Sequence, residues 1–323
     1  MNEQLALFES NLDKPRKTIV QSNSITTSKR SWTAAENKVL YIILSQIMEF
    51  KRLNGAEIDL TEDLLMTFDG SVLLEADKCI TRAVDTLKSL RERSIEIYNG
   101  KRRVVVGFIN YADYDTQSHE VKVQISSKIL PFFFSLTERF TQFALGTALE
   151  CNSIYSQRLF ELCAMFAQCG WFSFNLEEFR DVLSIKGYNE KKDLIKRSVK
   201  DPRSELLDLY NNELSDLFFT FFEKNSNITF LVHQRNEPVR NNVQWANLIS
   251  VLLSNVMNYK QVDIDEIFAQ YSLQSHSFKG LFKQLAMVNI HVKSKVEQRA
   301  KVAEILFSHG IHPTQINAKN AVQ

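Results

Sequence analysis

The order of helical and strand-like segments constrains the fold of this chain more than any single motif does. Residues 30–127 begin with helical patterns and end in strand-like runs, and residues 135–235 repeat that order. In both stretches a helix with several basic residues precedes strand-like runs that a short turn separates. The two stretches share element order rather than identical letters. This repetition predicts two versions of one small module.

The first stretch opens with a well-marked helix. Thr33 and Glu36 have the spacing of a capping box, and apolar residues recur behind them at helical spacing until about Asn54. The other predicted elements are a short strand at 57–60, a short helix from Thr61, a helix over 72–91, and strands in SIEIY, VVVGFINY and EVKVQI. Helices that lead into a recognition-type helix and then a β-hairpin are typical of a winged helix.

The second stretch supplies the same kinds of element. The predicted elements are helices over about 141–150 and 153–168, a strand in WFSF, a capped helix in NLEEFRDVLSI, a basic helix over 190–212, and strands in DLFFTFFEK and NITFLVHQ with a turn at 224–227. We therefore expect an α+β fold with two tandem winged-helix domains related by pseudo-symmetry, plus a small C-terminal helical region.

The two ends of the chain differ from these modules. Residues 14–30 hold five basic residues and no acidic residue, which predicts an arm rather than a packed element. Residues 243–260 and 263–309 have helical patterns and no strand signal. The expected division is a flexible arm at 1–30, winged-helix domains at 31–134 and 135–239, and a helical appendix at 240–323.

The basic helix of the second module is the strongest candidate for DNA recognition. Residues 186–203 contain seven basic and three acidic residues. At 100° per residue the cations at 192, 196, 200 and 203 fall within about one quadrant, beside an apolar arc. A helix fits the major groove, where Lys and Arg reach guanine edges or phosphates. The alternative is an ordinary solvated face. The candidate residues are Lys191, Lys192, Lys196, Arg197, Lys200 and Arg203.

A proline interrupts this helix. Pro202 removes a backbone donor, so it either kinks the helix or begins a second one with Asp201 as N-cap. In both cases the basic part is the N-terminal half.

The first module carries a similar excess of cations. Residues 82–103 contain seven basic and three acidic residues. These residues are candidates for contacts with DNA phosphates, which give affinity and salt sensitivity rather than sequence choice. The alternative is a solvated helix face followed by a polar turn. The candidates are Lys78, Arg82, Lys101, Arg102 and Arg103.

The composition points away from an enzyme, a metalloprotein or a membrane protein. The four cysteines form no Cys-x-x-Cys pair, which predicts reduced thiols in a cytoplasm and no zinc site. No apolar run approaches 18 residues, so no membrane partner is expected. No phosphate-binding Gly-rich loop precedes a lysine. We predict no catalytic residues and no cofactor. Asp113 and Asp115 could hold a metal in a primase or nuclease, but a polar hairpin turn explains them better.

Three segments resemble the iteron-binding plasmid replication initiators. The first is IVQSNSITTSKRSWTAAENKVLYIILSQI, and the third is FNLEEFRDVLSIKGYNEKKDLIKRSVKDP. The second, FTQFALGTALECNSIYSQRLFEL, is the most specific. Its residues match a Ser-x-Tyr-x-x-Arg-Leu-Tyr-Glu pattern, with Phe160 in place of the usual Tyr: Ser153, Tyr155, Arg158, Leu159, Phe160 and Glu161. The resemblance spans about 19–235.

The resemblance implies a tandem winged-helix protein that binds direct repeats in double-stranded DNA at an origin. Such proteins typically bind repeats as monomers, dimerise through the first module, repress their own gene and recruit host replication proteins. The basic helix around Lys196 would then be the recognition helix. The alternative within this class is a winged-helix transcription regulator with no role at an origin.

A short N-terminal sequence suggests a protein partner. Residues 4–8 read QLALF, which is similar to the Gln-Leu-x-Leu-Phe peptide that binds the bacterial sliding clamp. Leu5, Leu7 and Phe8 would enter an apolar groove while Gln4 forms a hydrogen bond at its edge. The alternative is a hydrophobic segment that packs on its own domain.

Overall fold

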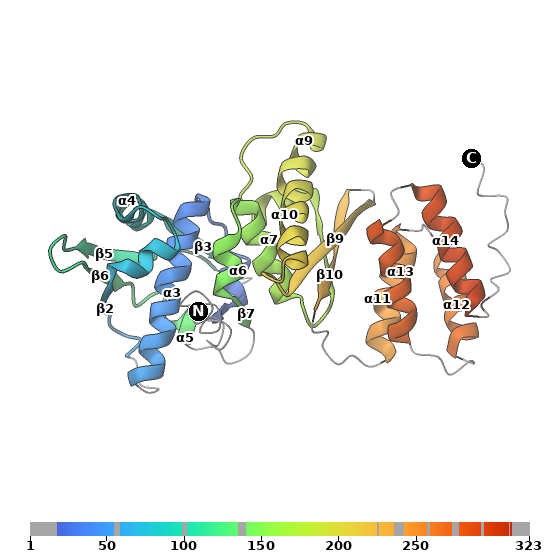
Figure 1. Cartoon of the computed structure of the whole chain (residues 1–323), viewed down its shortest axis with the longest axis horizontal. Helices are drawn as coiled ribbons and strands as arrows, with labels where there is room; N and C mark the ends of the chain where they lie inside the picture. The colour runs from blue at the N-terminus through green and yellow to red at the C-terminus, as the bar shows by residue number, and fades with distance from the viewer. Residues whose placement is uncertain are drawn as a thin grey trace, which may run out of the picture. The chain divides into compact units, whose positions relative to one another are not determined.

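The computed structural model describes residues 18–54, 59–98, 102–134, 140–224, 226–235, 242–256, 259–272, 278–291, 294–309 and 311 (Figure 1). The chain forms two compact units. One unit comprises the chain up to Met165 together with Glu178–Phe218, and the other comprises Phe166–Glu177 together with Phe219–Gln323.

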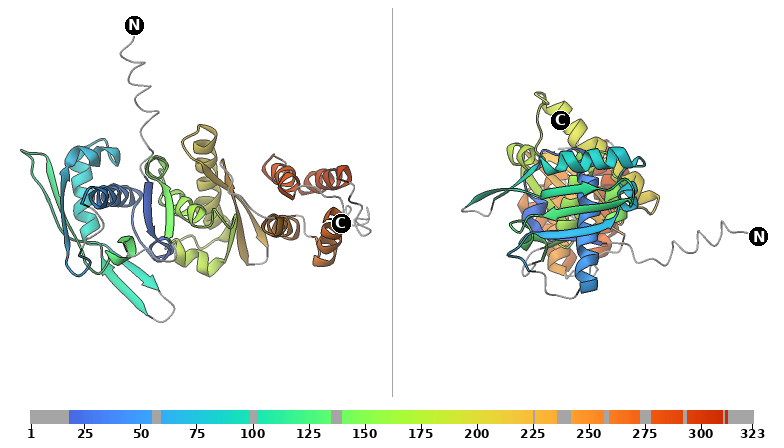
Figure 2. Two further views of the ribbon diagram at one scale, coloured as in Figure 1. Left: turned by 90° about the horizontal axis from the view of Figure 1, so that it is seen from below. Right: turned by 90° about the vertical axis from the view of Figure 1, so that its left-hand side faces the viewer.

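The first module is a winged helix. In chain order it contains α3 (Ala34–Asn54), β2 (Leu64–Asp69), η1 (Gly70–Glu75), α4 (Ile80–Arg91), β5 (Ile109–Tyr114) and β6 (Glu120–Ile125). The strands form an antiparallel sheet in the order β2-β6-β5, in which Leu64 lies opposite Ile125. The buried side of α3 and α4 forms the core of the module with residues such as Leu40, Ile43 and Leu87. Figure 2 shows this sheet face-on in its right-hand view.

The predicted start and end of α3 are confirmed. Thr33 Oγ1 accepts from the backbone N–H of Glu36 at 3.2 Å, and the Glu36 carboxylate accepts from the backbone N–H of Thr33 at 2.7 Å. Both bonds of a capping box are therefore present. The helix ends at Asn54, as expected.

The segment between α3 and α4 differs from the prediction. The predicted helix from Thr61 is wrong, because Leu64–Asp69 is strand β2, and the helix predicted over 72–91 begins only at Ile80. Strand β2 forms because β6 offers a complete antiparallel partner for it. The Asp69 side chain then accepts from the backbone N–H of Ser71 at 2.7 Å, which begins the short helix η1 instead. Residues 55–58 lie outside the described residues.

An additional hairpin follows α4. Strands β3 (Ser94–Tyr98) and β4 (Arg103–Gly107) form their own two-stranded antiparallel sheet. Lys101, one of the candidate DNA-binding residues, belongs to 99–101, which lie outside the described residues.

The prediction of a flexible arm is wrong for residues 18–30. Strand β1 (Thr18–Ser22) pairs antiparallel with β7 (Phe140–Ala144), and α2 (Asn23–Thr26) follows it directly. Figure 2 shows β1 and β7 side by side in its left-hand view. The helix predicted over 141–150 is also wrong in its first half, because α6 begins only at Leu145. The pairing explains both errors, since two segments more than 115 residues apart become strands together. Residues 1–17 lie outside the described residues.

The second module has the same order of elements and the same sheet topology. It contains α7 (Ile154–Met165), β8 (Trp171–Asn175), α8 (Leu176–Val182), α9 (Lys191–Ile195), η2 (Lys196–Lys200), α10 (Asp201–Asn211), β9 (Leu217–Lys224) and β10 (Asn227–Gln234). Its sheet order is β8-β10-β9, so the first strand pairs with the last one, as in β2-β6-β5. The predicted α+β fold with tandem winged helices is confirmed.

The C-terminal region is helical in its described parts. It contains α11 (Asn242–Val256), α12 (Gln261–Ser272), α13 (Phe278–His291) and α14 (Lys295–Ser308), so three helices stand where one stretch was predicted over 263–309. Leu231 of β10 belongs to the same buried cluster as Trp245, Leu252 and Leu285. The boundary between the compact units therefore does not lie between residues 239 and 240, where the sequence suggested a domain boundary. No helix in the described part of the chain is long and apolar enough to cross a lipid bilayer.

Candidate nucleic-acid interface

The basic segment forms one uninterrupted helix. Residues 191–195 are α-helical, 196–200 form a π-helical turn (η2), and 201–211 are α-helical again. Figure 1 shows α9 and α10 as one rod. Its apolar side is buried through Leu194, Ile195 and Val199, and Leu206 is also buried. The sequence pattern therefore predicted the position and the packed side of this helix correctly.

The cations of this helix lie on its exposed side. Lys191, Lys192, Lys196, Arg197 and Lys200 are all exposed. Within the described residues, Lys192, Lys196 and Lys200 have no acidic group within ion-pair distance, and Arg197 is 3.7 Å from Asp201 with both side chains in solvent. An exposed pair of this kind contributes little stability and separates easily. Four of the predicted residues are thus available to an anionic ligand.

Arg203 is placed differently from the other cations. Its side chain is half-buried, and this burial lowers the pKa of its guanidinium group. Sequence periodicity placed Arg203 with the lysines, but the helix turns it toward the protein.

The candidate cations of the first module are more strongly engaged with acids. Lys78 is exposed just before α4. Arg82 donates to both carboxylate oxygens of Asp77, at 3.0 and 2.7 Å. Arg103 forms an ion pair with Glu96 across the β3–β4 hairpin, and Arg102 is exposed beside it. This set is a weaker anion site than the basic helix, because two of its arginines already have carboxylate partners.

A cavity of about 440 Å³ gathers further cations that sequence reasoning did not select. Lys29, Arg93, Arg180 and Lys186 line it together with three acidic residues. Lys29 forms an ion pair with Asp181 at 2.8 Å, and Arg180 donates to the backbone carbonyl oxygens of Gly187 and Tyr188. Of these four cations, only Lys186 could have been selected from the sequence, because it lies just before the basic helix. The mixed charges argue against a dedicated anion site.

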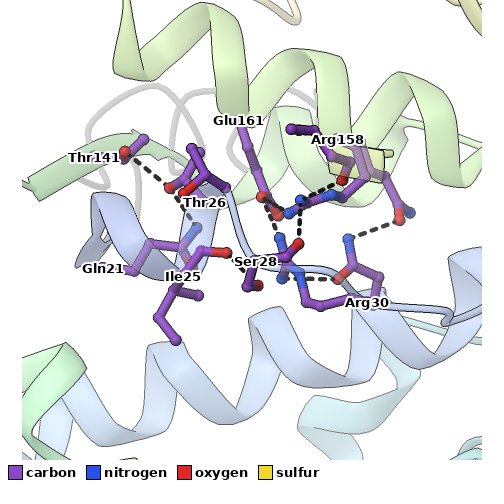
Figure 3. Close-up of polar contacts among 12 residues, drawn as sticks. Gln21, Ile25, Thr26, Ser28, Arg30, Thr141, Arg158 and Glu161 are labelled. Carbon is purple, nitrogen blue, oxygen red and sulfur yellow. Dashed lines mark hydrogen bonds and ion pairs between the residues drawn. The ribbon is translucent and has the colours of Figure 1, made fainter. Parts of the chain in front are cut away.

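Two charged residues of the Ser-x-Tyr-x-x-Arg-Leu-Tyr-Glu-like motif, Arg158 and Glu161, lie in the interior of the protein (Figure 3). Arg158 and Glu161 are almost fully buried and form an ion pair at 2.7 Å. Glu161 also pairs with Arg30 and accepts from the Tyr41 hydroxyl at 2.7 Å. Burial raises the pKa of Glu161, while the Arg30 charge and the hydrogen bonds from Tyr41 and Arg30 oppose that shift. The network joins α3, α7 and the segment after α2.

The same motif also holds the basic helix in place. Ser153 Oγ accepts from the backbone N–H of Ser156 at 2.9 Å and so caps α7. The carboxylate of Glu205, on α10, accepts from the Ser156 hydroxyl and from the backbone N–H of Asn152. A carboxylate at the N-terminus of a helix is favoured by the helix dipole. Glu205 therefore anchors α10 against the start of α7.

The predicted hairpin turn at Asp113 and Asp115 is confirmed. Asp113 lies near the end of β5, and the Asp115 carboxylate accepts from the backbone N–H groups of Gln117 and Ser118 inside the β5–β6 turn. These bonds lower the pKa of Asp115, with the bond from Gln117 as the largest cause. Within the described residues, no group of three or more acidic, Cys or His side chains could hold a metal ion. All four cysteines lie in the described part and are free thiols.

Comparisons with known proteins agree with this architecture. Residues 18–164 match the family model described as "Initiator Replication protein, WH1". A crystal structure of Pi initiator protein in complex with iteron DNA has a similar fold, with a TM-score of 0.51 and 16% sequence identity. The likeness covers 69% of this chain and 100% of the Pi chain. At that identity the structural likeness shows the fold alone, and the family match covers the first winged-helix module. Residues 18–164 are thus similar to the WH1 domain of initiator replication proteins.

Proposed function

We propose that this protein initiates plasmid replication by binding direct repeats in double-stranded DNA at the origin. The observation that carries the proposal is the exposed row of Lys192, Lys196 and Lys200 on the third helix of a winged-helix module. In such modules this helix enters the major groove, and its width suits that groove. The likeness to the Pi protein, whose structure contains iteron DNA, supports the same ligand.

The first module contributes affinity rather than sequence choice in this proposal. Lys78, Arg82, Arg102 and Arg103 would contact phosphates, and the ion pairs with Asp77 and Glu96 would open when DNA binds. Phosphate contacts of this kind strengthen binding at low salt for every sequence. We include Lys101 among the residues proposed to contact phosphates.

The resemblance to the plasmid replication initiators supports further parts of the proposal. The protein would act in the cytoplasm without enzymatic activity, form dimers that repress its own gene, and recruit host replication proteins. Residues 4–8 would bind the sliding clamp through Leu5, Leu7 and Phe8, with Gln4 at the edge of the groove.

A binding titration tests the central claim. Purified protein is titrated onto a duplex that carries the direct repeats beside its own gene, and in parallel onto a scrambled duplex of equal length. Wild-type protein should prefer the repeats, and Lys196→Ala plus Arg197→Ala should reduce affinity for the repeats by about tenfold or more. Lys122→Ala plus Lys128→Ala, which removes two exposed lysines elsewhere, is the matched control. Equal affinity of wild type and the Lys196/Arg197 variant would overturn the proposal. A footprint over one operator, with no repeats, would instead identify a transcription regulator.

A further inference from the structure

Pro202 lies inside the basic helix without breaking it. The residue before it, Asp201, donates its backbone N–H to the carbonyl oxygen of Lys196, five residues earlier. Lys200 has α-helical φ and ψ angles of −71° and −45°, so no second helix starts there. The proline is therefore accommodated by a widened turn rather than by a kink or a new N-cap. A π-type turn of this kind is uncommon in helices and is often found at functional sites.

The chemistry of proline explains why the turn widens. In an α-helix, residue 202 would donate to the carbonyl oxygen of Ser198, but proline has no N–H and its ring collides with that oxygen. A hydrogen-bond spacing of five residues moves the Ser198 carbonyl group away from the proline ring. Ser198 is fully buried, and its hydroxyl donates to the carbonyl oxygen of Leu194 at 2.7 Å, within the same turn.

The widened turn decides which side chains share a side of the helix. Every fourth residue from Leu194 to Leu206 is buried: Leu194, Ser198, Pro202 and Leu206. Every fourth residue from 192 to 204 is exposed: Lys192, Lys196, Lys200 and Ser204. In a regular α-helix each step of four residues advances about 40° beyond a full turn, so three steps would carry a row about 120° around the axis. The π turn offsets this drift.

We propose that Pro202 is a positioning residue for DNA recognition, which keeps the lysines at 192, 196 and 200 in one row along the groove. This inference rests on the proposed function. Downstream of the turn, α10 is anchored through Glu205 to Ser156. If the turn closed to α-helical spacing, the upstream half with Lys192 and Lys196 would rotate by about a quarter turn relative to Lys200. The cations would remain exposed, but their match to the base edges would be lost.

The test replaces Pro202 and measures sequence discrimination. Pro202→Ala restores the N–H, and Pro202→Val restores it while keeping more of the buried volume. Both should retain the affinity of wild type for a scrambled duplex to within about twofold, because the charges are unchanged. The ratio of affinities for repeat and scrambled duplexes should fall by about tenfold or more. Melting temperatures well above the assay temperature would show that both variants are folded during the measurement.

Two controls separate this inference from the proposed function. Pro131→Ala changes an exposed proline at the first position of α5 (Pro131–Phe134), where a missing N–H has no cost, and should leave the ratio unchanged. Lys196→Ala plus Arg197→Ala is measured in the same assay. If that variant loses affinity while both Pro202 variants keep the wild-type ratio, the positioning role of Pro202 is refuted and the proposed function stands. If the Lys196/Arg197 variant binds as wild type does, the proposed function itself fails.

Discussion

Arg158 of α7 donates from Nη2 to the backbone carbonyl oxygen of Ser28 at 2.8 Å, across 130 residues of sequence. The same nitrogen donates to the carbonyl oxygen of Val182 at 3.2 Å, and Nη1 pairs with Glu161. One buried guanidinium therefore joins three separate segments of the chain. This explains why the most specific motif in the sequence lies in the interior and not on the candidate DNA surface.

Removal of Arg158 should destabilise the protein strongly. Arg158→Met leaves the Glu161 carboxylate buried with one fewer cationic partner and leaves two carbonyl oxygens without their donor. We expect a loss of about 3–5 kcal/mol in the free energy of unfolding, as for other broken buried pairs. Urea denaturation measures this loss. Arg52→Ala, which removes an exposed ion pair with Glu49, should cost less than about 1 kcal/mol. Similar losses in the two variants would contradict the structural role of the motif.

The capping residue Glu36 should make the stability of the protein depend on pH in the acidic range. Burial acts to raise the pKa of Glu36, but hydrogen bonds from Ser89, Thr33 and Arg93 outweigh it, so the pKa lies below its ordinary value. The carboxylate therefore stabilises the folded state above the pKa of the unfolded chain, about 4.3, and this contribution is lost as pH falls through the lower folded-state pKa.

Glu36→Gln tests this dependence. The variant should be less stable than wild type by about 1 kcal/mol at pH 7, and the difference should shrink below about pH 4. Chemical denaturation over a pH series measures it, with the exposed Glu62→Gln as a control. A stability difference that does not change with pH would show that the carboxylate charge is not the cause.

Alanine substitutions of Lys200 and Arg203 should have different effects on DNA binding and on stability, although the two residues are only three positions apart on the basic helix. Lys200 is exposed, whereas Arg203 is half-buried with a lowered pKa. Lys200→Ala should weaken DNA binding and reduce the slope of log affinity against log salt by about one, with little change in melting temperature. Arg203→Ala should mainly lower the melting temperature. Fluorescence anisotropy at several salt concentrations and thermal unfolding test both variants. The reverse pattern would mean that Arg203 turns outward to meet DNA.

The N-terminal peptide should act independently of DNA binding. Leu7→Ala plus Phe8→Ala removes two apolar anchors and should abolish binding to the purified bacterial sliding clamp, while affinity for the repeats stays unchanged. Surface plasmon resonance with immobilised clamp measures the first effect, and a gel shift measures the second. Equal clamp affinity of the two proteins would refute this role of residues 4–8, and a simultaneous loss of DNA binding would instead indicate that they pack on their own domain.

Local pattern predicted the elements whose signals lie within a few residues of one another. The capping box at Thr33 and Glu36 marked the start of α3, and apolar periodicity placed the packed side of the basic helix. The repeated order of elements predicted both winged helices, because each module needs the same sequence of helical and strand periods. The exposed lysines of the basic helix followed from the same periodicity.

The remaining features of the fold depend on contacts between residues that are distant in the sequence. Strand β1 exists because β7 pairs with it, and the helical pattern of FTQFA could not reveal a partner more than 115 residues away. The motif around Arg158 forms its network with Ser28, Arg30 and Tyr41, so its residue types alone did not indicate burial. The partial burial of Arg203 likewise depends on packing against the module. Periodicity reports how each residue relates to its near neighbours, whereas the free energies of strand pairing and buried charge depend on groups that only folding brings together.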